Sequence, residues 1–317
     1  MVTTVRSEDK AAKIREAHPG AKLRVAIVPD IAAPDAFDQV VAKEAEGLVY
    51  VQHTASPFHY GWTDARTELL EPALEGTRSI LRAVKKHAPS VRRFVVTSSF
   101  AAIISADGLK DPSKTWSEAD WNPVTYEDGL RGDKVTGYRA SKTVAEHAAW
   151  DFVASERPNF NLATICPPVV FGPFAHHVPS LAAVNTSNQR VADLVAGKWR
   201  AAGEIPHPGV WLWVDVRDVA LAHANAMERP EAGGQRFFVT AGLHGNKDIA
   251  DAARRNFGTE LADRLPPADT PGGALPPPGE VYGYDNSRAT KVLGIDWIPL
   301  EKSIVDTINS LRTLGAF

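Results

Sequence analysis

Short apolar segments alternate with longer amphipathic segments along the first half of the chain, and this alternation restricts the fold more than any other feature. The apolar segments have the length and composition of buried strands: Leu23–Val28, Leu48–Gln52, Phe94–Thr97 and Leu162–Ile165. The amphipathic segments are the expected helices: Glu8–Glu16, Asp35–Glu44, Glu71–Lys86 and Tyr138–Glu156. Because alternating strands and helices build a parallel sheet covered by helices, we predict an α/β fold.

The pattern becomes irregular in the second half of the chain. There we expect two helices, a short strand and a loop rich in Pro and Gly: Ala183–Ala196, Val216–Met227, Phe237–Thr240 and Asp263–Gly279. A long loop is also expected at Ser105–Thr136, and loops of that length are usually functional. We expect residues 1–173 to form the sheet domain. Residues 174–317 should form mainly a smaller substrate lobe, with some segments returning to the sheet.

Tyr138 and Lys142 stand four positions apart, so they share one face of a helix. An ammonium group stabilises phenolate, so Lys142 is expected to lower the pKa of Tyr138 below its usual value of about 10. Hydroxyl residues end the preceding strand at Ser99, and such strand ends face the ligand crevice of parallel sheets. The three residues together predict a site that protonates a carbonyl while hydride arrives. Taken singly, each also fits a solvated helix face or a strand cap.

The set Ser99, Tyr138 and Lys142 resembles the catalytic triad of the extended short-chain dehydrogenase/reductases. Further segments resemble this family's motifs in the family's order: Thr4-Val-Arg-Ser7, Val28-Pro-Asp-Ile31, His53-Thr-Ala-Ser-Pro57, Glu71-Pro-Ala-Leu-Glu-Gly-Thr77, Cys166-Pro-Pro-Val-Val-Phe-Gly-Pro173, Trp213-Val-Asp-Val-Arg-Asp-Val-Ala-Leu-Ala-His223 and Tyr284-Asp-Asn-Ser-Arg288. The tail is similar to the branch of dihydroflavonol reductases, cinnamoyl-CoA reductases and fungal NADPH-dependent methylglyoxal and aldehyde (carbonyl) reductases. This resemblance implies a Rossmann-like doubly wound sheet, a catalytic triad and NADPH as cofactor.

The resemblance also implies which residues hold the cofactor. Arg6 and Lys10 follow the family's second strand, where a basic residue near the 2′-phosphate favours NADPH and an acidic residue favours NADH. A solvated helix start is the alternative for these two residues. The other implied cofactor contacts are Asp30, Ile31, Thr54, Ala55, Ser56, Tyr138, Lys142, Pro167, Val170 and Ser187.

One family motif is missing from the sequence. The family begins with a strand and a Gly-x-x-Gly-x-x-Gly turn, which holds the cofactor pyrophosphate at a helix N-terminus. Here Gly20, Gly47, Gly61 and Gly76 are isolated. We therefore expect the family's first strand and helix, roughly two dozen residues, to be absent. Either the sequence is incomplete, which the intact triad favours, or the chain is a degenerate relative.

Composition excludes several classes of function. A net charge of −3 without a clustered basic surface argues against nucleic-acid binding. No segment has the apolar length of a membrane span, and the histidines show no metal-ligand spacing, so neither a membrane nor a metal is expected. The single cysteine fits a reducing compartment, and we expect the cytoplasm.

The residues after Ser99 favour carbonyl reduction over the other reactions of this fold. Phe100, Ala101, Ala102 and Ile103 leave no acid where dehydratases of the fold place one. The second lobe also lacks a basic cluster suited to a UDP sugar. We predict an NADPH-dependent reductase of aldehydes or ketones.

The expected substrate of this reductase is a small apolar carbonyl compound. Several aromatic residues are candidates to line the pocket, although each also fits the core: Phe58, Tyr60, Phe100, Trp116, Tyr126, Phe171 and Trp213. A catalytically impaired or NADPH-sensing protein, and a nucleotide-sugar epimerase or dehydratase, remain as alternatives. Both a monomer and a homodimer remain open.

Overall fold

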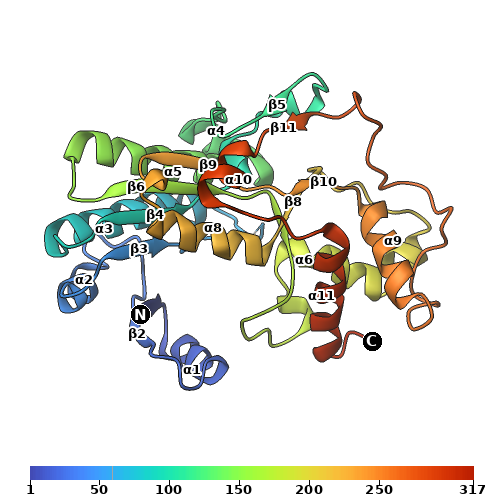
Figure 1. Cartoon of the computed structure of the whole chain (residues 1–317), viewed down its shortest axis with the longest axis horizontal. Helices are drawn as coiled ribbons and strands as arrows, with labels where there is room; N and C mark the ends of the chain where they lie inside the picture. Colours follow the sequence, from blue (N-terminus) through green and yellow to red (C-terminus); the bar gives the residue numbers. More distant parts are fainter. Residues whose placement is uncertain (59) are drawn as a thin grey trace.

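A computed structural model describes residues 1–58 and 60–317 of the chain. Its main sheet has four strands in the order β3-β4-β6-β9, and all three pairings are parallel. These strands are β3 (Tyr50–His53), β4 (Arg93–Thr97), β6 (Asn161–Cys166) and β9 (Gln235–Phe238). The predicted α/β fold with a parallel sheet is therefore confirmed (Figure 1).

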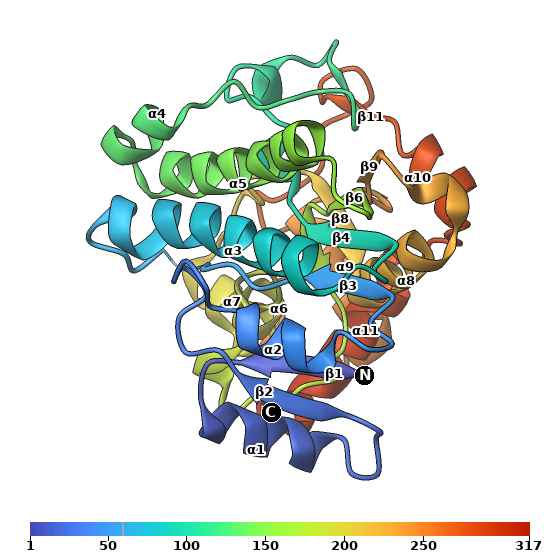
Figure 2. The ribbon, with the colours of Figure 1, turned by 90° about the vertical axis from the view of Figure 1, so that its left-hand side faces the viewer.

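Helices cover both faces of the main sheet. They are α2 (Asp38–Glu44), α3 (Glu71–His87), α5 (Lys134–Glu156), α8 (Val216–Glu228) and α10 (Ser287–Leu293). On β4, Phe94 and Val96 pack in one apolar cluster with residues of α3, while Val95 packs in another with residues of α8. Successive side chains of a strand point to opposite faces, so the sheet is buried on both sides and doubly wound. Figure 2 shows α3 and α5 side by side on one of these faces.

The first strand pair stands apart from the main sheet. β1 (Val2–Val5) and β2 (Arg24–Ile27) pair in parallel, and α1 (Glu8–Ala17) connects them. Within the described residues, β1 does not pair with β3, so each presents an open edge to the other. A cavity of about 190 Å³ separates them, lined by residues of both strands. This gap lies where the sequence predicts the family's first strand to be missing.

The second half of the chain builds a separate hydrophobic core. Its helices are α6 (Thr186–Val195), α7 (Lys198–Ala202), α9 (Asn246–Phe257) and α11 (Leu300–Thr313), and residues from all four pack in one cluster (Figure 1). A small sheet in the order β10-β8-β7 adjoins it, with β7 (Val169–Phe171), β8 (Leu212–Asp215) and β10 (Gly242–Leu243). In contrast, β9, α8 and α10 return to the main sheet. On this basis we propose a sheet domain at residues 1–173 and mainly a substrate lobe at 174–317.

The predicted loop Ser105–Thr136 is wrong in part. It contains β5 (Thr115–Trp116), which pairs with β11 (Gly283–Tyr284), and α4 (Tyr126–Arg131). Helix α4 forms because Thr125 and Asp128 make a reciprocal capping box at its start. Similarly, the Asp133 side chain accepts a hydrogen bond from the Thr136 amide, so α5 begins at Lys134 and not at Tyr138.

Several shorter turns complete the chain. They are a π-helical turn at Arg66–Leu70 and 3₁₀ turns at Phe100–Ala102, Gly108–Lys110, Leu181–Ala183 and Pro230–Ala232. The predicted loop at Asp263–Gly279 is confirmed. None of the helices in the described residues is long and apolar enough to cross a membrane.

Candidate active site

Two of the three predicted catalytic residues are in direct contact. Ser99 follows β4 in extended conformation, and its Oγ accepts a hydrogen bond from the Ala101 amide at 3.1 Å. The Tyr138 hydroxyl, on the second turn of α5, donates to the same Oγ at 3.3 Å. Lys142 lies one turn further along α5. The strand end and the helix therefore present a serine and a tyrosine hydroxyl at one point.

The predicted lowering of the Tyr138 pKa by Lys142 is wrong. The rings of Phe58 and Tyr60 pack against the Tyr138 ring, with centroid separations of 4.8 and 6.2 Å. Burial raises the pKa of Tyr138 to about 12, although the hydrogen bond with Ser99 acts in the opposite direction. The phenol therefore keeps its proton near neutral pH, because a buried phenolate would lack solvation.

Lys142 is buried, and its charge acts on the last residue of β3. Burial lowers the pKa of Lys142 to about 8. The pKa of His53, the last residue of β3, is lowered to about 4 by burial and then by the charge of Lys142. The charge of Lys142 is therefore felt at the end of the strand that precedes Thr54, Ala55 and Ser56.

A cavity of about 180 Å³ opens beside Ser99 and Tyr138. Of the seven aromatic residues considered from sequence, Phe58, Tyr60 and Phe100 line it. The other four pack elsewhere: Trp116, Phe171 and Trp213 are buried in apolar clusters, and Tyr126 packs against a cluster beside α4. Fewer aromatic side chains therefore line the cavity than the seven considered from the sequence.

The cavity also contains two arginines that the sequence did not single out. Arg139 lies next to Tyr138 on α5, and Arg190 lies on α6. The pattern Tyr-Arg-Ala-Ser-Lys gave no sign that Arg139 would face the site. Nothing local to Arg190 predicted that α6 would pack beside Tyr138.

Three of the predicted cofactor residues lie beside the serine turn. The Pro167 carbonyl accepts a hydrogen bond from the Phe100 amide at 2.9 Å. The Val170 amide donates to Ser187 Oγ at 3.3 Å, which ties β7 to the start of α6. Pro167, Val170 and Ser187 are therefore brought together at the end of the strands.

Asp30 and Ile31 follow β2. The Asp30 carboxylate accepts a hydrogen bond from the Ala32 amide at 2.9 Å, and this contact fixes the turn. Ile31 packs on Gly76 of α3 so closely that a Cβ atom at Gly76 would lie 2.9 Å from Ile31 Cδ1. A glycine at position 76 thus lets the turn after β2 approach α3.

Four of the remaining predicted cofactor residues line two other cavities, and Ser56, which is half-buried, lines neither of them. Thr54 and Ala55 line the gap between β1 and β3. Arg6 and Lys10 are exposed and line a cavity of about 310 Å³ with His176 and His177 among its neighbours. The cations of Arg6 and Lys10 suit a phosphate, and they lie at a different cavity from Ser99 and Tyr138. In the described part of the chain, no glycine-rich turn offers amide groups to a pyrophosphate.

A buried ion pair connects the tyrosine helix to the strands next to Ser99. Arg236 of β9 donates to both carboxylate oxygens of Glu146 at 2.8 and 3.0 Å. Glu146, on α5, also accepts from Ser98 Oγ at 2.5 Å and from Thr164 Oγ1 at 2.7 Å. Burial acts to raise the pKa of Glu146, but the charge of Arg236 and these hydrogen bonds hold it below the usual value. The pair therefore ties three strands to the tyrosine helix, directly beside Ser99.

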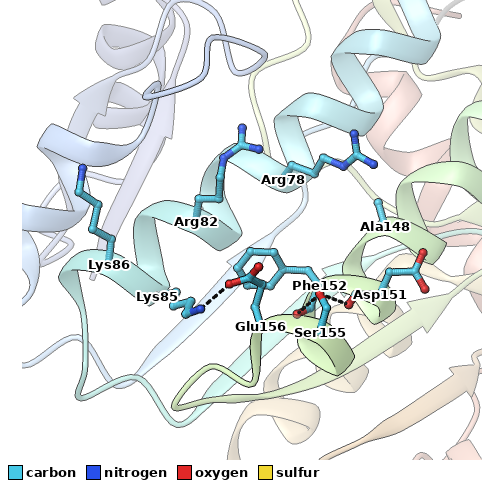
Figure 3. A pocket seen from close by; sticks show the side chains of 9 residues that line it. All are labelled: Arg78, Arg82, Lys85, Lys86, Ala148, Asp151, Phe152, Ser155 and Glu156. Atoms are coloured by element: carbon cyan, nitrogen blue, oxygen red, sulfur yellow. Dashed lines mark hydrogen bonds and ion pairs between the residues drawn. The ribbon is translucent and has the colours of Figure 1, made fainter.

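A second groove, between α3 and α5, contains no residue of the triad (Figure 3). Its cations are balanced locally: Lys85 pairs with Glu156 at 2.5 Å and Arg78 with Glu75 at 2.8 Å. This balance leaves the groove without a strong excess of positive charge. Within the described residues, no group of three His, Cys, Asp or Glu side chains is placed to hold a metal ion.

The chain belongs to the NAD dependent epimerase/dehydratase family, which it matches over residues 2–241. It is 43% identical to the ketoreductase azaE of Aspergillus niger, over 98% of this chain and 90% of that protein. It is 35% identical to the NADPH-dependent methylglyoxal reductase of Saccharomyces cerevisiae, over 98% of this chain and 90% of the relative.

The fold is also similar to that of solved structures. The crystal structure of Gre2 from Candida albicans in complex with NADPH superposes with a TM-score of 0.90 at 34% identity, covering 99% of this chain and 91% of that one. The doubly wound fold and the family resemblance found in the sequence are therefore confirmed.

Proposed function

We propose that this chain is an NADPH-dependent reductase of aldehydes or ketones, with Tyr138 as the proton donor. The observation that carries this proposal is the hydrogen bond between Tyr138 and Ser99 in an aromatic cavity at the ends of parallel strands. The similarity to a ketoreductase and to an NADPH-dependent methylglyoxal reductase supports both the reaction class and the cofactor.

Each residue of the triad has a separate role in this reaction. Tyr138 keeps its proton at neutral pH and can give it to a carbonyl oxygen that accumulates negative charge. Ser99 orients the same oxygen through a hydrogen bond, which also favours the phenolate that remains, and Lys142 would hold the nicotinamide ribose. NADPH, when bound, supplies the hydride.

We assign the cofactor contacts by position. Arg6 and Lys10 would bind the 2′-phosphate, because an arginine fork and a lysine charge both suit phosphate. Tyr138 and Lys142 would hold the nicotinamide ribose. The other contacts proposed for the cofactor are Asp30, Ile31, Thr54, Ala55, Ser56, Pro167, Val170 and Ser187. The described residues provide no pyrophosphate cradle, so no role is assigned at that position.

Substitution of Tyr138 by Phe tests the proposal. Because the change removes the proton donor and keeps the ring, kcat for a ketone should fall by about 10²–10⁴-fold while circular dichroism stays unchanged. Tyr126→Phe is the matched control, since Tyr126 begins α4 and does not line the cavity. Near-full activity of Tyr138→Phe, or no turnover of any aldehyde or ketone by the unchanged chain, would contradict the proposed function.

A catalytically impaired protein that binds or senses NADPH is the second candidate. The open gap between β1 and β3 favours it. Epimerase or dehydratase activity is less well supported, because apolar residues follow Ser99 at the positions where an acid is needed. We further propose a small apolar carbonyl substrate, a cytoplasmic location, and a monomer or homodimer as the assembly.

A further inference from the structure

The cavity beside Tyr138 contains two guanidinium groups and no carboxylate. Arg139 and Arg190 line it together with Ser99 and Tyr138. Neither arginine forms an ion pair within the described residues. Nη1 of Arg190 is buried and has no hydrogen-bond partner there. Because a buried donor without a partner is costly, this nitrogen points to a ligand that would satisfy it.

The surroundings place this positive charge close to the reacting position. Burial raises the pKa of Tyr60, whereas the positive charges of Arg139 and Arg190 act to lower it. Both arginines are therefore close enough to Tyr60 to act on its hydroxyl group. The Tyr60 ring lies 6.2 Å from the Tyr138 ring. The two guanidinium groups therefore lie around one aromatic side chain that packs on the proton donor.

Neighbouring ionisable groups leave the charge of Arg190 uncompensated. The charge of Arg139 acts on Asp133, but the Asp133 carboxylate is used to cap α5, where it accepts a hydrogen bond from the Thr136 amide at 2.8 Å. His244 lies near Arg190, and burial together with the arginine charge lowers the pKa of His244 to about 3, so this imidazole is neutral. The site thus carries net positive charge beside an aromatic wall.

We propose that the carbonyl substrate carries a carboxylate close to its carbonyl group, as in an aryl or alkyl 2-oxo or 3-oxo acid, and that Arg190 binds this carboxylate with help from Arg139. A guanidinium fork matches the two oxygens of a carboxylate, and pairing in a partly buried site relieves an unpaired cation. The apolar part of the substrate packs on Phe58, Tyr60 and Phe100. This inference rests on the proposed reductase function, and the carboxylate is bound without being transformed.

The test compares one acid with its neutral ester. Benzoylformate and methyl benzoylformate share a ketone and an aromatic ring but differ in charge. Calorimetric titration of the full chain should give a Kd for the acid about tenfold to hundredfold lower than that for the ester, as expected for a charge-assisted contact. Arg190→Leu should abolish this preference and Arg139→Leu should reduce it. The control Arg131→Leu, at an exposed position on α4, should leave it unchanged.

Two further measurements are needed. One distinguishes a substrate carboxylate from the pyrophosphate of NADPH as the anion bound by Arg190, and the other distinguishes failure of this inference from failure of the proposed function. The pyrophosphate of NADPH offers similar oxygens, so the Kd for NADPH is measured for the unchanged chain and for Arg190→Leu. A Kd for NADPH within twofold of the original supports the substrate assignment. A larger loss, with the acid preference retained, would overturn it. Equal or weaker binding of the acid than of the ester would overturn it too. The proposed function fails separately, if the methyl ester is bound but never reduced.

Thermal stability identifies a purely structural role for Arg190. Removal of an unpaired, partly buried cation should leave the melting temperature of Arg190→Leu unchanged or higher. A clear fall in melting temperature, with the acid preference intact, would show that Arg190 supports the fold and would overturn the assignment.

Discussion

Glu146→Gln is expected to destabilise the fold strongly, because it removes the negative charge that faces a buried guanidinium. The side chains of Arg236 and Glu146 are 6% and 0% exposed. Removal of one partner from a buried ion pair costs about 3–5 kcal/mol, a large part of a total stability of about 5–15 kcal/mol. A chain of this length unfolds with an entropy of about 0.7 kcal/mol/K, so the melting temperature should fall by about 5–8 °C.

The effect of Glu146→Gln should depend on pH. The pKa of Glu146 is lowered in the folded chain, so its stabilising contribution is fully present above the unfolded value of about 4.3. That contribution is lost as the pH falls through the folded value. The difference in unfolding free energy between the unchanged chain and Glu146→Gln should therefore be largest at neutral pH and shrink below about pH 4.

Urea unfolding followed by tryptophan fluorescence at several pH values measures this difference. Glu127→Gln is the matched control, because its pair with Arg131 is 3.6 Å long and exposed, and such pairs contribute little. The double substitution Glu146→Leu with Arg236→Met should recover part of the lost stability, since it leaves no unpaired charge. If Glu146→Gln lowers the unfolding free energy by less than about 1 kcal/mol at pH 7, the reasoning is refuted. Arg236 would then not be a buried charge that depends on Glu146.

Two other predictions concern the cofactor. Arg6→Ala should raise the KM for NADPH about tenfold to hundredfold while changing that for NADH little, since only NADPH carries the 2′-phosphate; equal effects on both would leave Arg6 as a solvated helix start. A strand with a Gly-x-x-Gly-x-x-Gly turn from a related reductase, fused before Met1, should fill the gap between β1 and β3 and raise both the melting temperature and the affinity for NADPH measured by calorimetry. An equal melting temperature and an equal NADPH affinity with and without this addition would contradict the second prediction.

Local patterns were sufficient to predict much of the fold. The strands β4 and β6 are buried along most of their length and consist mainly of apolar residues, which explains why their positions follow from the sequence. The start of α5 was misplaced because the apolar stripe begins after Tyr138, whereas the helix is set by the cap at Asp133. The available signal was Asp133, five residues before Tyr138, which is a typical residue for a helix N-cap.

The site was predicted less completely, because its environment depends on contacts between distant segments. The family resemblance placed Ser99 beside Tyr138, and the structure brings them together. The pairing of Glu146 with Arg236, 90 positions away, has no local signature. The same holds for the high pKa of Tyr138, which depends on burial of a ring against which Phe58 and Tyr60 pack.

The single cysteine of the chain makes it possible to measure how often the buried network around Glu146 opens. Cys166 is fully buried at the end of β6, and burial followed by the nearby Glu146 charge raises its pKa to about 12. Alkylating reagents need an accessible thiolate, so they will modify this thiol only while the strand is transiently open. The rate of labelling under native conditions therefore records how often the centre of the sheet opens. The chain thus carries its own single-site reporter of local unfolding, without an introduced probe.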